Sequence, residues 1–196
     1  STGTLSVARF GNKFATDSNL GAGTNVAFGT TASLAKLRYT GSGETSDRTF
    51  SLTGSSGVTV LFEQAGTGPL VLTGNILTTG AANKTVRLMG DAAPAEFAGA
   101  LSDYGTSRSN SLAKYGTGIW TLSGANLFKG AVTIFDGILR LKTGGTLGAG
   151  PKTLTITGAA SVPLRYPSLQ LAGADGPVSI PSEITLRTSN EHTGAL

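Results

Sequence analysis

The sequence has no cysteine and, among its 196 residues, only one histidine and one methionine. Without cysteine, disulfide bonds and thiolate metal sites are unavailable, so the chain must be stable through packing and backbone pairing. Its histidine, His192, has only Glu191 as an acidic neighbour, whereas a metal site needs three or four converging ligands. The repeated Gly-Gly-x-Gly-x-Asp pattern of calcium-binding coils is also missing. We therefore expect no metal and no other cofactor.

Long apolar runs and clustered charge are missing as well. No stretch of about 18 apolar residues occurs, which excludes a helical transmembrane segment within this chain. The 15 Lys and Arg are spread from Arg9 to Arg187 without a cluster, and only 13% of residues are charged. Nucleic-acid binding needs adjacent cations, so the net charge of +4 predicts no nucleic-acid partner. No basic and apolar leader opens the chain, and we expect a processed product or an excised fragment.

The sequence is rich in glycine, with 29 residues. Between the glycines lie short segments in which apolar residues alternate with Thr, Ser or Arg. Such alternation predicts half-buried strands. The predicted strands are 4–7, 49–52, 58–60, 70–72, 85–88, 119–122, 132–134, 139–141, 154–156, 169–171 and 184–186. Most end near a glycine, such as Gly54, Gly74, Gly90 or Gly124, which we expect to supply the positive φ of a tight corner. The best helical candidate is 92–101, and Pro94 and Gly99 weaken it.

The spacing of these strands favours an all-β, parallel β-helix, in which coils of about 20 to 25 residues stack and like strands pair. Hairpin signals of the Asn-Gly type are absent. The chain also resembles itself at long range, since Gly3–Val7 matches Gly137–Leu141 and Asn19–Gly23 matches Thr146–Gly150, with a short insertion at Gly11–Ser18 in the earlier copy. Self-similarity of this kind indicates a repeat array. A β-sandwich is the alternative fold, because many short alternating strands also suit it.

One segment carries a resemblance to a known family. Lys114–Asn126, KYGTGIWTLSGAN, is followed by GAVTI from Gly130 and DGIL from Asp136. Together these resemble the passenger-associated transport repeat, the β-strand repeat of autotransporters, whose pattern runs K-x-G-x-G-T-x-T-L-S-G-x-N-T-Y-x-G-x-T-x-I-x-x-G-x-L. The segments 43–49 and 66–70 resemble the spacer coils that accompany such repeats. Phe128, Lys129 and Phe135 depart from the pattern, and the bulky Phe135 predicts an exposed lateral contact or a wider coil.

The resemblance implies a right-handed parallel β-helix, uncapped at both ends, that serves as a structural stalk of a large secreted or cell-surface adhesin exported through the outer membrane. On this interpretation residues 1–196 form a single array, with one repeat at about 114–141 and spacer coils on either side. The expected partners are neighbouring coils of the parent chain or copies of this chain, associated head to tail or laterally, and surface glycans or a host surface. No catalytic residue and no enzymatic activity are expected.

The alternative function is a carbohydrate-binding or carbohydrate-active β-helix, akin to polysaccharide lyases and tailspikes. A glycoside hydrolase needs two carboxylates roughly 5 to 9 Å apart. The nearest pairs in sequence are Glu44 with Asp47, and Asp91 with Glu96. We expect Glu44 and Asp47 instead to cap main-chain amides and to pair with Arg48. A flat threonine array that binds ice is a further possibility, but Pro94, Pro163 and Pro167 interrupt the coil regularity that it requires.

The remaining candidate residues are interpreted as structural. The glycine pairs 116/118, 144/145 and 148/150 mimic phosphate loops, but no helix follows them, and a dinucleotide site needs one. Asn75 and Asn126 follow corner glycines and are expected to bond neighbouring coils through their amides. Around the repeat, the predicted inward residues are Trp120, Leu122, Val132, Ile134, Leu139 and Leu141, and the predicted outward residues are Thr121, Thr133, Arg140 and Lys142.

Overall fold

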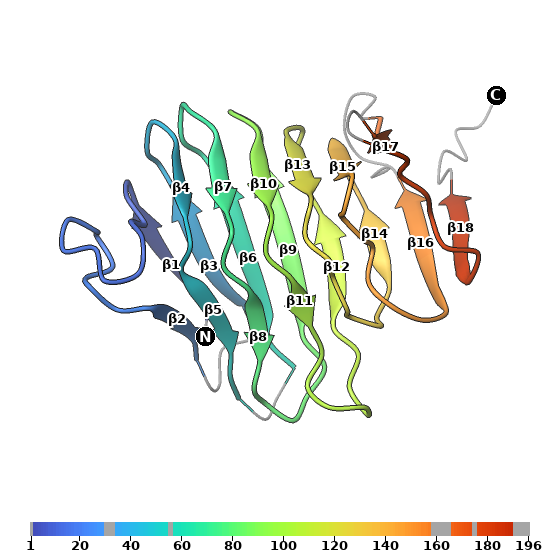
Figure 1. The fold of residues 1–196 in the computed structure, drawn as a ribbon, viewed down its shortest axis with the longest axis horizontal. Coiled ribbons are helices and arrows are strands. Elements are labelled where there is room, and N and C mark those ends of the chain that lie inside the picture. Colours follow the sequence, from blue (N-terminus) through green and yellow to red (C-terminus); the bar gives the residue numbers. More distant parts are fainter. Residues whose placement is uncertain (1, 30–33, 55–56, 158–165, 174–175, 190–196) are drawn as a thin grey trace.

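The computed structural model describes residues 2–29, 34–54, 57–157, 166–173 and 176–189. Within these ranges the chain forms eighteen β-strands and no helix, and all the strand pairs are parallel. The strands lie side by side along the long axis of the molecule, with β1 near one end and β18 near the other (Figure 1). The predicted all-β parallel β-solenoid is confirmed. The β-sandwich alternative is wrong, because a sandwich is built from antiparallel sheets.

The strands form three sheets. The eight-stranded sheet contains, in order, β1 (Thr2–Val7), β3 (Leu34–Tyr39), β6 (Thr59–Gln64), β9 (Thr85–Gly90), β12 (Ser111–Lys114), β14 (Val132–Ile134), β16 (Lys152–Thr157) and β18 (Ile184–Ser189). The six-stranded sheet contains β4 (Glu44–Ser46), β7 (Leu70–Leu72), β10 (Ala95–Phe97), β13 (Ile119–Leu122), β15 (Ile138–Lys142) and β17 (Ser168–Ala172). The four-stranded sheet contains β2 (Asn25–Phe28), β5 (Thr49–Leu52), β8 (Ile76–Thr78) and β11 (Leu101–Ser102).

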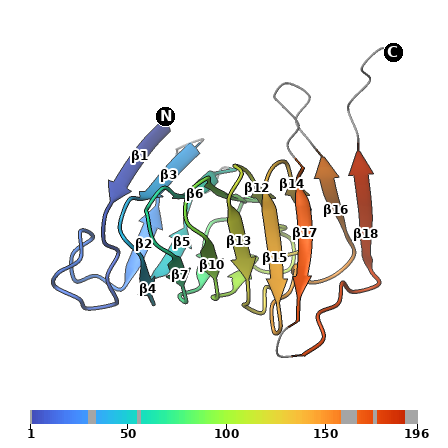
Figure 2. The same cartoon turned by 90° about the horizontal axis from the view of Figure 1, so that it is seen from above.

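Three coils pass through all three sheets in the same order, from the eight-stranded to the six-stranded and then to the four-stranded sheet. They are β3–β4–β5, β6–β7–β8 and β9–β10–β11, whereas β12 to β17 alternate between the eight-stranded and six-stranded sheets. The pairs Leu34–Thr59 and Thr59–Thr85 are 25 and 26 residues apart, and the pair Val132–Leu154 is 22 residues apart. These separations match the predicted coil length of about 20 to 25 residues. Seen from above, the coils follow one another along a single axis (Figure 2).

In-register pairing stacks like residues into columns that fill the interior. In the eight-stranded sheet, Leu37, Phe62 and Leu88 occupy one such column, and all three side chains are buried. The pleat of each strand sends alternate residues inward, so a second column, which includes Val60 and Val86, lies beside the first. The early coils add an aromatic cluster in which Phe50 packs edge-on against Phe62, with ring centroids 5.0 Å apart. Beyond β11, Phe128 and Leu147 from the connecting loops are fully buried and continue the third side of the core.

At one corner of the solenoid, glycine is required because successive coils lie too close together to leave space for a side chain. Gly74, Gly99 and Gly124 lie one above another, and a Cβ on Gly124 would stand 2.0 Å from the Gly99 carbonyl oxygen. The same holds for Gly99 against Gly74, at 2.1 Å. Positive φ, the reason predicted from the sequence, applies to Gly54 and Gly90 but not to this ladder. At the ladder glycine is needed because any side chain would push the coils apart.

All eleven predicted strands are confirmed, whereas two other expectations are wrong. Residues 92–101 form β10 and the start of β11, because Ala95 and Phe97 point inward with a period of two and not with a helical period. The repeat array that the self-similarity indicated is confirmed, but the first matched pair of segments is not structurally equivalent. Gly3–Val7 lies in β1 of the eight-stranded sheet and Gly137–Leu141 in β15 of the six-stranded sheet, so the matched segments occupy different sides of the solenoid.

The first coil is longer than the next one. Thr2 pairs with Leu34, 32 residues on, whereas Leu34 pairs with Thr59, 25 residues on. The extra residues lie in the connection between β1 and β2, which projects from the end of the molecule (Figure 1). The position agrees with the insertion predicted at Gly11–Ser18.

The glycine ladder makes a testable prediction. We expect Gly124→Ala to lower the free energy of unfolding by at least about 2 kcal/mol, because backbone atoms of the preceding coil occupy the space of the new methyl group. The matched control is Gly3→Ala in β1, where no atom lies within 4 Å of the new Cβ, and little change is expected. Chemical denaturation of both variants provides the measurement. Equal stability of the two variants would contradict close stacking at the corner.

Candidate functional site

The first predicted carboxylate pair ties the projecting connection to the solenoid. Glu44 begins β4, and its two carboxylate oxygens accept the N–H groups of Phe10 and Gly11, at 2.6 and 3.0 Å. Asp47 accepts the N–H of Lys13 at 2.7 Å. The predicted capping of main-chain amides is therefore confirmed. Both carboxylates therefore hold the connection between β1 and β2 against the corner of the second coil.

The expected pairing of these acids with Arg48 is wrong. Arg48 is fully buried, and its guanidinium donates to main-chain carbonyl oxygens, among them those of Phe10, Gly21 and Gly23. These carbonyls belong to the long first coil, which bends over the start of β5. A guanidinium presents five donors in a planar fork, so it satisfies several inward-turned carbonyls at once.

The second carboxylate pair is divided between separate sets of partners. Asp91 accepts hydrogen bonds from the main chain and hydroxyl of Thr117 on the following coil. Glu96, on the outer face of β10, accepts the Ser123 hydroxyl at 2.5 Å and the Lys142 ammonium at 2.7 Å. Burial alone would raise the pKa of Glu96, but the hydrogen bonds and charge of Lys142, with Ser123, lower it overall. A carboxyl group with a lowered pKa is a weak general acid at neutral pH.

The other residues singled out from the sequence have structural positions. Gly116 and Gly118 pack against the carbonyl of Gly90, and no helix follows them in the described chain. The Trp120 side chain is buried, and its indole N–H donates to the Met89 carbonyl oxygen at 3.0 Å. This corner therefore has no open cradle for a phosphate, and Trp120 offers no exposed ring for a sugar.

The asparagine prediction is confirmed. Asn75 accepts the N–H of Ala100 on the next coil, at 2.9 Å. Asn126 accepts the N–H of Leu101 on the preceding coil and donates to the carbonyl of Thr146 on the following one. Each amide thus joins adjacent coils at a corner where the strand pairing is interrupted.

The inward predictions around the repeat are confirmed, but two outward ones need correction. Trp120, Leu122, Val132, Ile134, Leu139 and Leu141 are all buried. Thr121 was expected to face solvent and is only 5% exposed; we attribute this to its register neighbours Glu96 and Arg140, whose long side chains flank it. For Phe135 an exposed lateral contact or a wider coil was expected; the side chain is half-buried and stacks on Tyr115 of the preceding coil, with centroids 4.6 Å apart, and the wider coil stays a prediction.

Buried cations are the feature that the sequence did not reveal. Arg48, Lys84, Lys114 and Lys152 are all buried, and the amine of Lys114 donates to the carbonyl oxygens of Tyr115, Gly116 and Asp136. Burial lowers the pKa of Lys114 to about 8, although the charges of Asp136 and Asp91 oppose the shift. Burial likewise lowers the pKa of Lys152 to about 8, against the charge of Asp103.

These buried cations change how the net charge is interpreted. The buried charged residues of the described chain are four cations and one carboxylate, Asp136. Most of the formal net charge of +4 therefore lies in the interior, where it serves the inward-turned carbonyls. The remaining surface cations include Lys36 and Arg38, which lie within 3.2 and 3.6 Å of Glu63.

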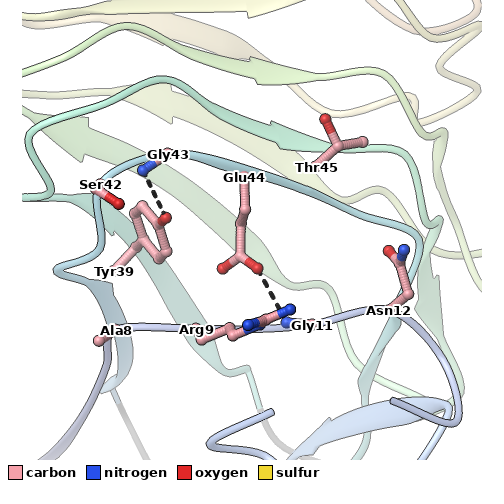
Figure 3. A pocket seen from close by; sticks show the side chains of 9 residues that line it. All are labelled: Ala8, Arg9, Gly11, Asn12, Tyr39, Ser42, Gly43, Glu44 and Thr45. Atoms are coloured by element: carbon pink, nitrogen blue, oxygen red, sulfur yellow. Dashed lines mark hydrogen bonds between the residues drawn. The ribbon is translucent and has the colours of Figure 1, made fainter. Parts of the chain in front are cut away.

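Two clefts lie in the first coils. A polar cleft of about 370 Å³ is lined by Ala8, Arg9, Gly11, Asn12, Tyr39, Ser42, Gly43, Glu44 and Thr45 (Figure 3). The figure shows the Glu44 side chain crossing from β4 to the Ala8–Asn12 segment, with the Tyr39 ring beside it. An apolar cleft of about 360 Å³ lies at the end formed by β1, β2 and β3, where its lining includes Leu5, Val26 and Phe28.

Sequence reasoning found Glu44 but missed the polar cleft. Arg9, Asn12 and Ser42 follow no recognisable motif, and the coil register that brings them together is not visible in the sequence. His192 lies outside the described residues. In the ranges that the structure describes, no three His, Asp or Glu side chains are grouped so as to hold a metal ion. The same ranges contain no helix that is long and apolar enough to cross a membrane.

Comparison with known proteins gives one informative similarity. The chain is 35% identical over 141 residues, 70% of its length, to the adhesin BmaC autotransporter of Brucella suis biovar 1 (strain 1330). That match covers 4% of the adhesin, so the chain corresponds to a small part of a much longer protein. No family model matches the chain. No solved structure matches it. The chain is thus a distant homologue of one segment of an autotransporter adhesin.

Lys114 allows the role of the buried cations to be tested. In the folded protein its pKa is about 8, below the ordinary value of 10.5, so between these values the unfolded chain binds more protons. Stability must therefore rise with pH in this window. We expect the free energy of unfolding to increase from pH 8 to pH 10 by a smaller amount in Lys114→Met than in the unsubstituted chain.

The same variant should be less stable at pH 7 by about 1 to 3 kcal/mol, because three carbonyl groups lose their donor. Lys142→Met, at an exposed position, is the control and should change stability by less than about 1 kcal/mol. Denaturant titrations at several pH values give both results. An identical pH dependence in the unsubstituted chain and Lys114→Met would contradict the assignment.

Proposed function

We propose that the chain is a stalk segment of a large secreted or cell-surface adhesin of the autotransporter type, acting through extension and surface display. The observation that carries the proposal is the continuous parallel register from β1 to β18, which forms one stack of coils. Such a stack lengthens by adding coils without changing its cross-section. On this proposal residues 1–196 are a single array, secreted or attached to the outer membrane through parts of the parent protein outside this sequence.

The residues of the 114–141 repeat support the proposal because they serve the stacking. Lys114 satisfies corner carbonyls, Gly116 packs against the preceding coil, and Asn126 joins the coils on either side of it. Because these residues are needed for stacking, the same pattern can recur in other coils whose outward side chains differ. We therefore assign this segment as one passenger-associated repeat. The similarity to an autotransporter adhesin agrees with that assignment.

The two ends of the stack also support it. Leu5, Leu171 and Leu186 occupy inward columns on terminal strands, yet they are 51%, 47% and 53% exposed. Their register partners Leu37, Leu141 and Leu154 lie on strands that pair on both edges, and they are buried. The apolar cleft at the β1 end has the same origin. We propose that neighbouring coils of the parent chain, or copies of this chain, cover these ends.

The catalytic alternative receives less support. Glu44, Asp47 and Asp91 accept main-chain amides, and Glu96 is held by a lysine and a serine. Carboxylates engaged in this way maintain the coil corners, and a glycosidase needs one of its pair to remain protonated at working pH. We therefore propose a non-enzymatic role.

A tandem protein tests the stalk proposal directly. Two copies joined end to end should form one rod, with a maximum dimension in solution scattering about twice that of a single copy. A flexibly jointed pair or a folded-back pair would contradict extension by stacking. The single chain provides the reference length.

The exposed ends lead to a separate prediction. If unpaired end strands associate head to tail, sedimentation at increasing concentration should show oligomers, and Leu186→Lys should reduce them because a charge would enter the apolar column. Thr185→Lys is the matched control, since this exposed residue lies next to Leu186 on β18 but on its outer face. Equal association of the two variants, or a strictly monomeric unsubstituted chain, would contradict the proposal.

A further inference from the structure

The polar cleft of the first two coils has features that coil stacking does not explain. We propose that it binds a neutral saccharide unit, a function that does not depend on the stalk proposal. The cleft lies between the Ala8–Asn12 segment and the corner from Tyr39 to Thr45 (Figure 3). Its volume of about 370 Å³ falls within the range of about 300 to 1,000 Å³ that is usual for small-molecule sites.

A buried hydroxyl group faces the cleft with a proton to donate. Tyr39 is 1% exposed, and its hydroxyl oxygen accepts the N–H of Gly43 at 2.9 Å. Among the described residues this hydroxyl group donates no hydrogen bond, although a buried donor ordinarily does. Burial raises the pKa of Tyr39, against the hydrogen bond from Gly43 and together with the charge of Glu44, so the proton is retained at neutral pH. A ligand in the cleft can supply an acceptor for it.

Glu44 places an acceptor on the same cleft. Each of its carboxylate oxygens accepts one main-chain N–H and has capacity for another hydrogen bond. A ligand hydroxyl both accepts and donates, so a pair of adjacent hydroxyls can accept from Tyr39 and donate to Glu44. Adjacent hydroxyl groups are the defining chemistry of saccharides.

The rest of the lining favours a neutral, hydroxylated ligand over a charged or apolar one. The Arg9 guanidinium is paired with Asp17 at 2.6 Å, and Glu44 is compensated by the two amides. Asn12 accepts the N–H of Asp47 through its side-chain oxygen, which leaves its NH₂ group free to donate at the rim. Ser42 adds an exposed hydroxyl. The only exposed apolar side chain among the described residues that line the cleft is the methyl group of Ala8, which offers little surface to a lipid or a flat aromatic compound.

The cleft is already formed without a ligand. Glu44 holds Phe10 and Gly11, and the Ser46 hydroxyl donates to the Gly11 carbonyl at 2.6 Å. On the other side, the Asn19 side chain accepts the N–H groups of Ala8 and Arg9. A wall fixed in this way loses little conformational freedom on binding, which favours a small ligand.

The test is a titration of the whole chain with glucose, galactose and N-acetylglucosamine, and with sialic acid as the charged comparison, followed by amide chemical shifts. We expect at least one neutral sugar to shift the amides around Gly43 and Gly11, and sialic acid to bind more weakly. Tyr39→Phe, which keeps the ring but removes the hydroxyl, should weaken binding by about fivefold to tenfold. The shifts of distant strands report that the variant remains folded.

A second pair of variants separates occupancy of the cleft from loss of structure. Ser42→Trp places an indole at the rim and should abolish the shifts, whereas Ser182→Trp, at an exposed turn near the opposite end, should leave them unchanged. The proposal is overturned if no neutral sugar shifts these amides, which would mean that water alone fills the cleft. It is also overturned if Tyr39→Phe and Ser42→Trp bind as tightly as the unsubstituted chain. Either outcome would leave the stalk proposal intact.

Discussion

Parallel stacking in register is the constraint on which the rest of this structure depends. Strands about 4.8 Å apart bring the corners of successive coils so close that Gly99 and Gly124 have no space for a side chain. The same closeness turns many main-chain carbonyls toward a dry interior, where an unpaired polar group is costly. Arg48 and Lys114 satisfy such carbonyls directly. Stacking thus determines both the glycines and the buried cations of the sequence.

The same constraint explains the positions of the charged residues that the sequence offered as catalytic or binding candidates. Asp47 and Asp91 complete the hydrogen bonding of neighbouring segments, and the four buried cations serve carbonyl groups inside the solenoid. What remains on the outside is a long surface of mixed side chains, suited to extension and display. The exception is the polar cleft in the first coils, where the longer connection before β2 adds a second wall opposite the corner that carries Tyr39 and Glu44.

The fold was largely predictable because the two-residue alternation of a half-buried strand is a local signal. The eleven predicted strands, the inward position of Trp120 and the bridging role of Asn126 all follow from neighbouring residues. Strands such as β4 and β12 escaped notice, because Ser46 and Lys114 place polar side chains in the interior and break the alternation. The cleft was not predictable, since Arg9 and Ser42 meet only through the register of one coil on the next.

The central claim is that each coil is stabilised by the coils on both sides of it. Amide hydrogen exchange, measured strand by strand in the single chain, tests this most directly. The account predicts the slowest exchange in β9 and β12, which pair on both edges, and progressively faster exchange toward β1 and β18, which pair on one edge only. Equal protection from β1 to β18, with all amides exchanging through one global unfolding step, would contradict it.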